Sequence, residues 1–276
     1  MSELTDYTGF LLRNAFLRTS RTSTQHLGPD GHPRDAGVLM TLITSGPTSQ
    51  QELVARLNVN RTVMVKLIDG LERRGWVARV RNPEDRRAYA LQATAAGRAA
   101  LEEMLPRLDQ AEAEITAPLT AGESARLKAL LRALLHDPPE ELAQRLGFLI
   151  TKTHHLFHER ANLEVEPLGL QIRHFGALKQ LAGGVPSQRE LADRLNVSTP
   201  VIVELVDALE AKGLVERRRD PSDRRSNGLA VTPAGRRAVR EAQERLEAAN
   251  GELTAPIGED GDRELRSLLR KLLDYA

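Results

Sequence analysis

An aspartate followed by two arginines occurs twice in the chain, as Asp85-Arg86-Arg87 and as Asp223-Arg224-Arg225. Each triplet comes directly after a turn-forming sequence that contains a proline, Asn82-Pro83-Glu84 and Asp220-Pro221-Ser222. Guanidinium groups suit phosphate oxygens and narrow minor grooves, and the aspartates are expected to orient the arginines. A single arginine pair is most often a solvated surface, but its recurrence at matching places favours contact with a nucleic-acid duplex.

The two triplets are 138 residues apart because the chain is a duplication. Arg56-Leu57-Asn58-Val59 recurs as Arg194-Leu195-Asn196-Val197, and the alignment at this offset needs no gap from residue 49 to residue 98. The junction is placed near Asp137-Pro138-Pro139, since the prolines forbid helix continuation. With 276 residues, the chain is long enough for two domains that each bury a core. We predict that these domains are residues 1–137 and 138–276.

Each copy predicts the same order of elements. Helices are expected at 4–20, 34–45, from Ser49, at 61–74 and from Thr94, with strands at 76–80 and 89–91. The second copy has helices at 140–160, 172–182, from Ser187, at 199–212 and from Thr232, with strands at 214–217 and 228–231. A final leucine-striped helix ends each copy. A short helix, a turn, a second helix and a basic hairpin form a winged helix-turn-helix, so the fold class is mainly α (α+β).

Local residue choices support these boundaries. Ser49 with Glu52, and Ser187 with Glu190, have the spacing of a helix-capping box. Gly75 and Gly213 follow the second helix of each pair, where a left-handed residue ends a helix. The apolar first and last helices carry more hydrophobic surface than one domain needs, which predicts an interface between the copies.

Longer motifs make each half resemble the MarR (multiple antibiotic resistance regulator) family. They are Leu71-Glu72-Arg73-Arg74-Gly75-Trp76-Val77 and 81–87 in the first half, and Leu209-Glu210-Ala211-Lys212-Gly213-Leu214-Val215 and 219–225 in the second. The resemblance covers essentially the whole chain, twice. It implies a dimer joined through its N- and C-terminal helices. The fused chain is therefore expected to form an intramolecular pseudo-twofold dimer and to be a monomer in solution.

The resemblance also implies where double-stranded DNA binds. In this family the fourth helix reads the major groove, and the wing arginines approach the minor groove and phosphates. The DNA-binding residues implied in the first copy are Asn60, Arg61, Thr62, Lys66, Arg81, Arg86 and Arg87. Those implied in the second copy are Ser198, Thr199, Glu204, Arg219, Arg224 and Arg225.

The two copies differ in charge. Glu204 stands where the first copy has Lys66, and residues 49–98 hold ten basic and five acidic residues against nine and eight in 187–236. Because phosphate neutralisation dominates DNA affinity, the first half should bind more strongly. We expect a pseudo-palindromic or asymmetric operator, with two related, unequal half-sites about one helical turn apart. The alternative is one DNA-binding half with the second half a scaffold or protein-interaction module.

A small-molecule effector is the other expected partner, because relatives in the family sense ligands near their interface helices. The residues that could serve are Tyr7, Arg13, Phe16, His154, Phe157 and His158. His154 and His158 have an i,i+4 spacing that can hold zinc, but no further metal ligand is evident. An exposed polar helix face or hydrogen bonds in the interface between the copies would explain them as well, and neither a metal nor a cofactor is predicted.

Composition excludes several other classes. The chain has no cysteine, and aromatic residues are 3%, which argues against disulfides, thiolate metal sites and a stacking platform for single strands. It contains no glycine-rich phosphate loop and no hydrolase or metalloprotease motif, so an enzyme is not expected. No apolar run reaches the length of a membrane span, and the N-terminus lacks a signal pattern. We expect a cytoplasmic, nucleoid-associated regulator, with repression the default because a bound dimer can occlude a promoter.

Overall fold

The computed structural model describes residues 3–29, 31–57, 59–81, 89–184, 187–219 and 227–275. It divides into two compact units: unit 1 is Met1–Asn14 with His154–Arg266, and unit 2 is Ala15–Thr153 with Ser267–Ala276. Each unit holds most of one copy of the repeat and is completed by segments of the other copy. The division of the sequence into copies at residues 137 and 138 stays a prediction.

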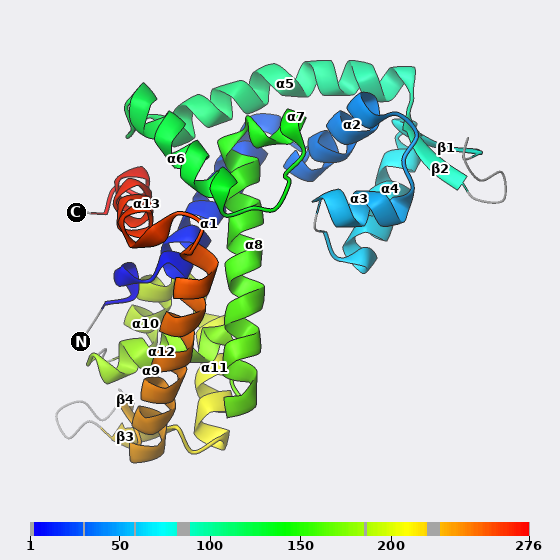
Figure 1. The fold of residues 1–276 in the computed structure, drawn as a ribbon. Coiled ribbons are helices and arrows are strands. Elements are labelled where there is room, and N and C mark those ends of the chain that lie inside the picture. Colours follow the sequence, from blue (N-terminus) through cyan, green and yellow to red (C-terminus); the bar gives the residue numbers. More distant parts are fainter. Residues whose placement is uncertain are drawn as a thin grey trace. The chain divides into compact units, whose positions relative to one another are not determined.

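Unit 2 contains the helix-turn-helix of the first copy (Figure 1). Its elements are α2 (Pro33–Ser45), α3 (Gln50–Leu57), α4 (Arg61–Arg73), β1 (Val77–Arg81), β2 (Tyr89–Ala93), α5 (Ala95–Thr116), α6 (Ala121–Ala133) and α7 (Glu140–Ala143). The two strands pair antiparallel, and the hairpin is extended by an isolated bridge between Thr48 and Leu91. Buried side chains of α2, α3 and α4, including Leu39, Leu53 and Ile68, form one core.

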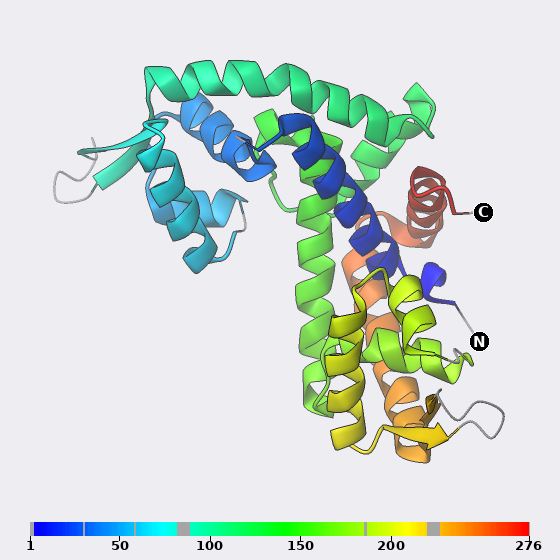
Figure 2. The same ribbon diagram turned by 180° about the vertical axis from the view of Figure 1, so that it is seen from behind.

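Unit 1 repeats this arrangement (Figure 2). Its elements are the 3-10 turns η1 (Leu4–Asp6) and η2 (Glu166–Leu168), α9 (Ile172–Ala182), α10 (Gln188–Leu195), α11 (Thr199–Ala211), β3 (Val215–Arg219), β4 (Asn227–Val231) and α12 (Pro233–Thr254). Its core includes Leu178, Leu191 and Val206. Three helices have residues in both units: α1 (Thr8–Leu27), α8 (Leu146–Val165) and α13 (Gly258–Leu272). The predicted mainly helical, winged helix-turn-helix class is confirmed.

The root of each wing is held by a close contact between the hairpin and the long helix after it. Thr94 caps α5, and its hydroxyl also donates to Gly75 O at 2.6 Å. Thr232 caps α12 in the same way and donates to Gly213 O at 2.8 Å. A Cβ added at Gly97, one turn into α5, would lie 2.1 Å from Trp76 O. Glycine is required there because the helix backbone lies directly against the strand.

The long first helix predicted in each copy is divided in the structure. The expected helix at 4–20 is η1 followed by α1, and the expected helix at 140–160 is α7 followed by α8. The turns correspond, since Tyr7 N donates to Leu4 O at 3.1 Å and Arg145 N donates to Leu142 O at 2.9 Å. Leu4 and Leu142 are buried in the cores of units 1 and 2. Each short element that precedes the long helix thus carries a buried leucine at the matching position.

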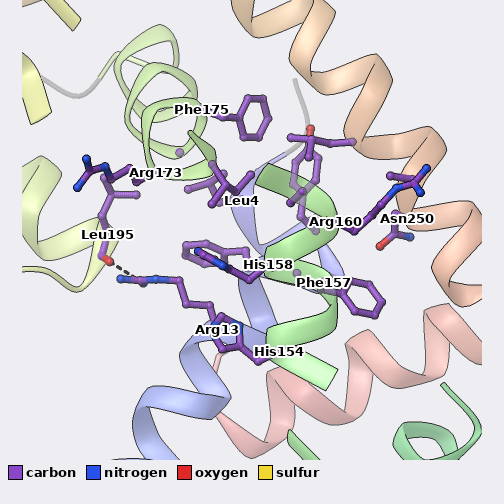
Figure 3. A pocket seen from close by; sticks show the side chains of 18 of the residues that line it. Leu4, Arg13, His154, Phe157, His158, Arg160, Arg173, Phe175, Leu195 and Asn250 are labelled. Atoms are coloured by element: carbon purple, nitrogen blue, oxygen red, sulfur yellow. Dashed lines mark hydrogen bonds between the residues drawn. The ribbon is translucent and has the colours of Figure 1, made fainter. Parts of the chain in front are cut away.

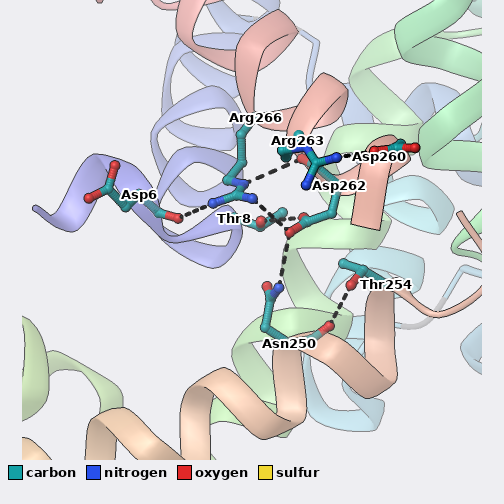
Figure 4. A network of polar contacts seen from close by, with 8 residues as sticks. All are labelled: Asp6, Thr8, Asn250, Thr254, Asp260, Asp262, Arg263 and Arg266. Carbon is teal, nitrogen blue, oxygen red and sulfur yellow. Dashed lines mark hydrogen bonds and ion pairs between the residues drawn. The ribbon is translucent and has the colours of Figure 1, made fainter. Parts of the chain in front are cut away.

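Within unit 1, a polar network joins the N-terminal segment to α12 and α13 (Figure 4). The buried hydroxyl of Thr8 donates to Asp262 Oδ1 at 2.6 Å, although the two residues are 254 positions apart. Asn250 and Arg266 contact the other carboxylate oxygen, each at 3.3 Å, and Arg266 also donates to Asp6 O at 3.0 Å. A buried carboxylate with three partners stabilises one arrangement of these segments.

Candidate DNA-binding helices and ligand pocket

Helix α4 presents a polar face at the end of unit 2 that also carries the wing. Its Asn60 cap accepts from Thr62 N at 2.8 Å, which satisfies one of the free N–H groups of the first turn. Arg61, Thr62 and Lys66 are exposed, while Met64, on the opposite face, is fully buried. The amphipathic pattern therefore fixes the helix by one side and leaves the predicted contact residues accessible on the other.

Helix α11 occupies the matching place in unit 1 with different side chains. Ser198 is its N-cap residue without a side-chain capping bond, and Pro200 lies in the first turn. Thr199 and Glu204 are exposed, as predicted for contact residues. The helix carries three acidic and no basic residues, whereas α4 carries three basic and two acidic residues. The two helices thus differ by four charges, with α4 the more positive.

Only part of the predicted wing surface falls in the described residues. Arg81 ends β1 and is exposed, and Arg219 ends β3. Arg86 and Arg87, within 82–88, and Arg224 and Arg225, within 220–226, lie outside the described residues. Behind the wings, Arg79 pairs with Glu72 at 3.0 Å. At the matching place in unit 1, Arg217 pairs with both Asp207 and Glu210.

Unit 1 contains a cavity of about 300 Å³ between α1, α8, α9, α11 and α12 (Figure 3). Its wall is mostly apolar, with four aromatic rings from Tyr7, Phe10, Phe157 and Phe175. Tyr7 packs edge-on against Phe175 with ring centroids 5.9 Å apart. A cavity of this size and lining can hold a small organic molecule with a flat apolar body.

Basic side chains also line the cavity. Arg13, Arg160 and Arg173 belong to the lining, together with His154 and His158. Burial lowers the pKa of His154 to about 3, with smaller contributions from neighbouring His155, His158 and Arg13. Burial lowers the pKa of His158 as well. Both imidazoles are therefore neutral near pH 7, and the positive charge of the wall comes from arginine.

Five of the six ligand residues predicted from sequence line this cavity: Tyr7, Arg13, His154, Phe157 and His158. Phe16 is not in the lining; it belongs to unit 2 and is the counterpart of His154 at the 138-residue offset. Phe10 and Arg173 were missed. Phe10 could have been found from its position one turn after Tyr7, whereas Arg173 required knowledge of how α9 packs. Among the described residues, no group of three potential metal ligands occurs.

The cavity is connected physically to the helix-turn-helix of unit 1. Arg13 Nη1 donates to Leu195 O, the last residue of α10, at 2.9 Å (Figure 3). Val201 and Leu205 of α11 form part of the cavity wall. A molecule in the cavity would therefore touch both the helix that carries the polar face and the residue that holds the end of α10.

Each unit is a winged helix-turn-helix, and the sequence comparisons agree. Sequence models of the MarR family match residues 34–89 and 168–226. A transcriptional regulatory protein provisionally assigned to the hcr operon of Thauera aromatica is 31% identical over 136 residues, or 48% of this chain and 81% of that protein. The transcriptional repressor NicR of Pseudomonas putida is 30% identical over 134 residues, 48% of this chain and 85% of NicR. The chain belongs to the MarR family and contains two MarR-like domains in tandem.

Both relatives are named as regulators of transcription, in agreement with the placement of this chain in a family of transcriptional regulators. Among solved structures, CouR of Rhodococcus jostii bound to p-coumaroyl-CoA is 33% identical, with a TM-score of 0.44 over 49% of this chain and 96% of CouR. In the described part of the chain, no helix is long and apolar enough to cross a membrane.

Proposed function

We propose that this chain is a ligand-responsive repressor in which one polypeptide reads both halves of an asymmetric operator. The observation that carries the proposal is the pair of matching helices, α4 and α11, each anchored by buried residues and exposed on the opposite face. Two such helices in one chain remove the need for a second subunit. The protein then acts as a monomeric pseudo-dimer joined through its N- and C-terminal helices.

The two helices contribute unequally to binding. Lys66 adds a cation to the exposed face of α4, and Glu204 adds an anion at the matching position of α11. Each cation that neutralises a phosphate steepens the salt dependence of affinity. Unit 2 therefore supplies most of the electrostatic attraction, while Glu204 can accept a hydrogen bond from a cytosine amine and specify a base.

The experiment is selection from a random-duplex pool, followed by salt titration of the selected duplex. We expect two unequal half-sites about ten base pairs apart. Lys66→Ala should weaken binding and reduce the slope of log affinity against log salt by about one. Replacing Arg86 and Arg87 with alanine should cost more affinity than replacing Arg224 and Arg225. If the second pair has no effect, unit 1 is a scaffold, and if no sequence is enriched, the proposal fails.

The effector we propose is a small aromatic anion held in the cavity of unit 1. The aromatic wall suits its ring, and Arg13 and Arg173 suit its charge. At the corresponding positions unit 2 has Thr151 and Asp35, and Asp35 is already paired with Arg74 at 2.7 Å. One chain should therefore bind one effector, and occupancy should bias α11 because Val201 and Leu205 form part of the wall.

Calorimetry with 1-naphthoate and its neutral analogue 1-naphthalenemethanol tests this assignment. We expect one naphthoate site per chain, weaker binding of the alcohol, and loss of that preference in Arg173→Gln. Two equal sites per chain, or equal affinity for acid and alcohol, would contradict it. Adding naphthoate to the complex with the selected duplex should lower DNA affinity if the site is linked to repression.

A further inference from the structure

Exposed valines recur at matching positions of the two recognition helices. Among the described residues, seven large apolar side chains are exposed, and four of them are valines on α4 and α11. Val63 and Val65 of α4 are 37% and 41% exposed, and Val201 and Val203 of α11 are 41% and 38% exposed. Scattered apolar side chains need no explanation, but a pair that recurs at the same helical positions does. Val201 lines the cavity of unit 1, so Val203 is the exposed valine of α11 that remains to be explained.

The valines lie on the two shoulders of each exposed helix face. In α4 they flank Met64, which is fully buried, so a helical rotation of about 100° per residue turns them to opposite sides of the helix. Thr62 and Lys66 form the ridge between them. An α-helix about 10–12 Å across fills a major groove about 12 Å wide, so both shoulders approach base edges when the ridge faces the groove floor.

The chemistry of the groove limits what these valines can contact. Valine is a poorer helix former than alanine, and more than a third of each of these valines stays exposed to water in the unbound protein, where that apolar surface gives no stabilisation. The apolar group that the major groove offers is the 5-methyl of thymine. The ridge differs between the helices, with Lys66 in one and Glu204 in the other, whereas the valine shoulders are the same. The matching valines Val65 and Val203 are thus the component of base reading that both half-sites can share.

We propose that Val63 and Val65 of α4 and Val203 of α11 read thymine methyl groups, so that each half-site is specified in part by thymine; Val201 instead faces the cavity of unit 1. This inference rests on the proposed function, because it requires that both helices enter the major groove. It names the specificity-determining side chains of each half-site and the chemical group that they recognise. It also predicts sensitivity to 5-methylcytosine, which presents a methyl group at the same ring position.

The test uses the selected duplex with deoxyuridine in place of thymidine, one half-site at a time. Deoxyuridine keeps the base pair and removes only the methyl, so affinity should fall about three- to fivefold for each contacted thymine. At a contacted thymine, replacement of the A·T pair by G·C should cost more than replacement by a pair of guanine with 5-methylcytosine. Binding that is indifferent to deoxyuridine in both halves overturns the inference, as does a selected site without thymine in either half.

Variants assign the effect to the valines. Val63→Ala with Val65→Ala should lower affinity for the thymidine duplex and abolish discrimination against deoxyuridine in one half-site only. Val203→Ala should reduce discrimination in the other half-site. Leu163→Ala on α8 removes an apolar side chain that is 57% exposed and outside both helices, and it should leave discrimination unchanged. Discrimination that survives in the valine variants overturns the inference while leaving DNA binding intact; absence of any sequence-specific binding instead overturns the proposed function first.

Discussion

Replacing Gly97 with alanine should loosen the root of the wing in unit 2. The added Cβ would lie 2.1 Å from Trp76 O, 2.9 Å from Trp76 C and 3.1 Å from Leu39 Cδ2. The first two neighbours are backbone atoms that cannot rotate away. Trp76 O also accepts from Thr94 N at 3.0 Å, so moving it weakens the bond that joins the hairpin to α5. The helix and the strand must therefore separate.

The expected cost follows from three contributions. Overpacking costs about 1–3 kcal/mol, and loss of the bond between Thr94 N and Trp76 O costs about 1 kcal/mol more. Alanine is a better helix former than glycine by about 1 kcal/mol, which offsets part of this loss. The free energy of unfolding should fall by about 2 kcal/mol. At a urea dependence of about 2 kcal/mol per molar, the midpoint should fall by about 1 M.

The assay is urea unfolding followed by tryptophan fluorescence. Trp76 is the only tryptophan of the chain, and the guanidinium of Arg74 lies 4.1 Å from its ring centroid, so the signal reports this unit. The control is Gly122→Ala on α6, where no atom beyond the backbone of the helix itself lies within 4 Å of an added Cβ. This variant should be neutral or slightly stabilised. A Gly97→Ala midpoint equal to or above that of the control would refute the close-packing argument.

Three further predictions concern charge. Burial lowers the pKa of Lys152 from 10.5 to about 7, so between these pH values the unfolded chain binds more protons than the folded chain and the free energy of unfolding rises with pH. This rise between pH 6 and 9 should be smaller in Lys152→Met. An unchanged rise would argue against a buried amine. Asp262→Ala should lower the free energy of unfolding by about 3 kcal/mol, because Thr8 and Arg266 lose a buried partner. The control Asp260→Ala, at an exposed ion pair, should change it by less than about 1 kcal/mol. Equal urea midpoints for the two variants would contradict this. Glu204→Gln should strengthen binding to random-sequence duplex measured by fluorescence anisotropy, and weaker binding would contradict the assigned charge asymmetry.

The helix-turn-helix order could be predicted because local signals agree with the fold. The predicted caps of α3 and α10, the first helix of each helix-turn-helix, are confirmed. Ser49 accepts from Glu52 N at 3.1 Å, and Ser187 accepts from Glu190 N at 3.2 Å. Gly75 and Gly213 take φ values of 70° and 68°, the left-handed conformation expected after α4 and α11. Each of these features depends on residues close together in the sequence.

Contacts between distant segments could not be predicted in this way. No local signal indicates that Leu4 and Thr8 pack with unit 1 rather than with the copy of the repeat to which they belong. The lining of the cavity could not be predicted for the same reason, because Arg13 from α1 and Arg173 from α9 belong to different copies of the repeat. Periodicity identified the faces of the helices, but packing partners 150 or more residues away depend on tertiary structure.

The most direct test of the central claim is the stoichiometry of the complex with DNA. Sedimentation velocity with a labelled duplex, selected as described above, should show one chain per duplex at saturation. One chain would then supply both recognition helices, as the tandem MarR-like domains predict. Two chains per duplex, each occupying one half-site, would contradict the claim that a single polypeptide reads the whole operator.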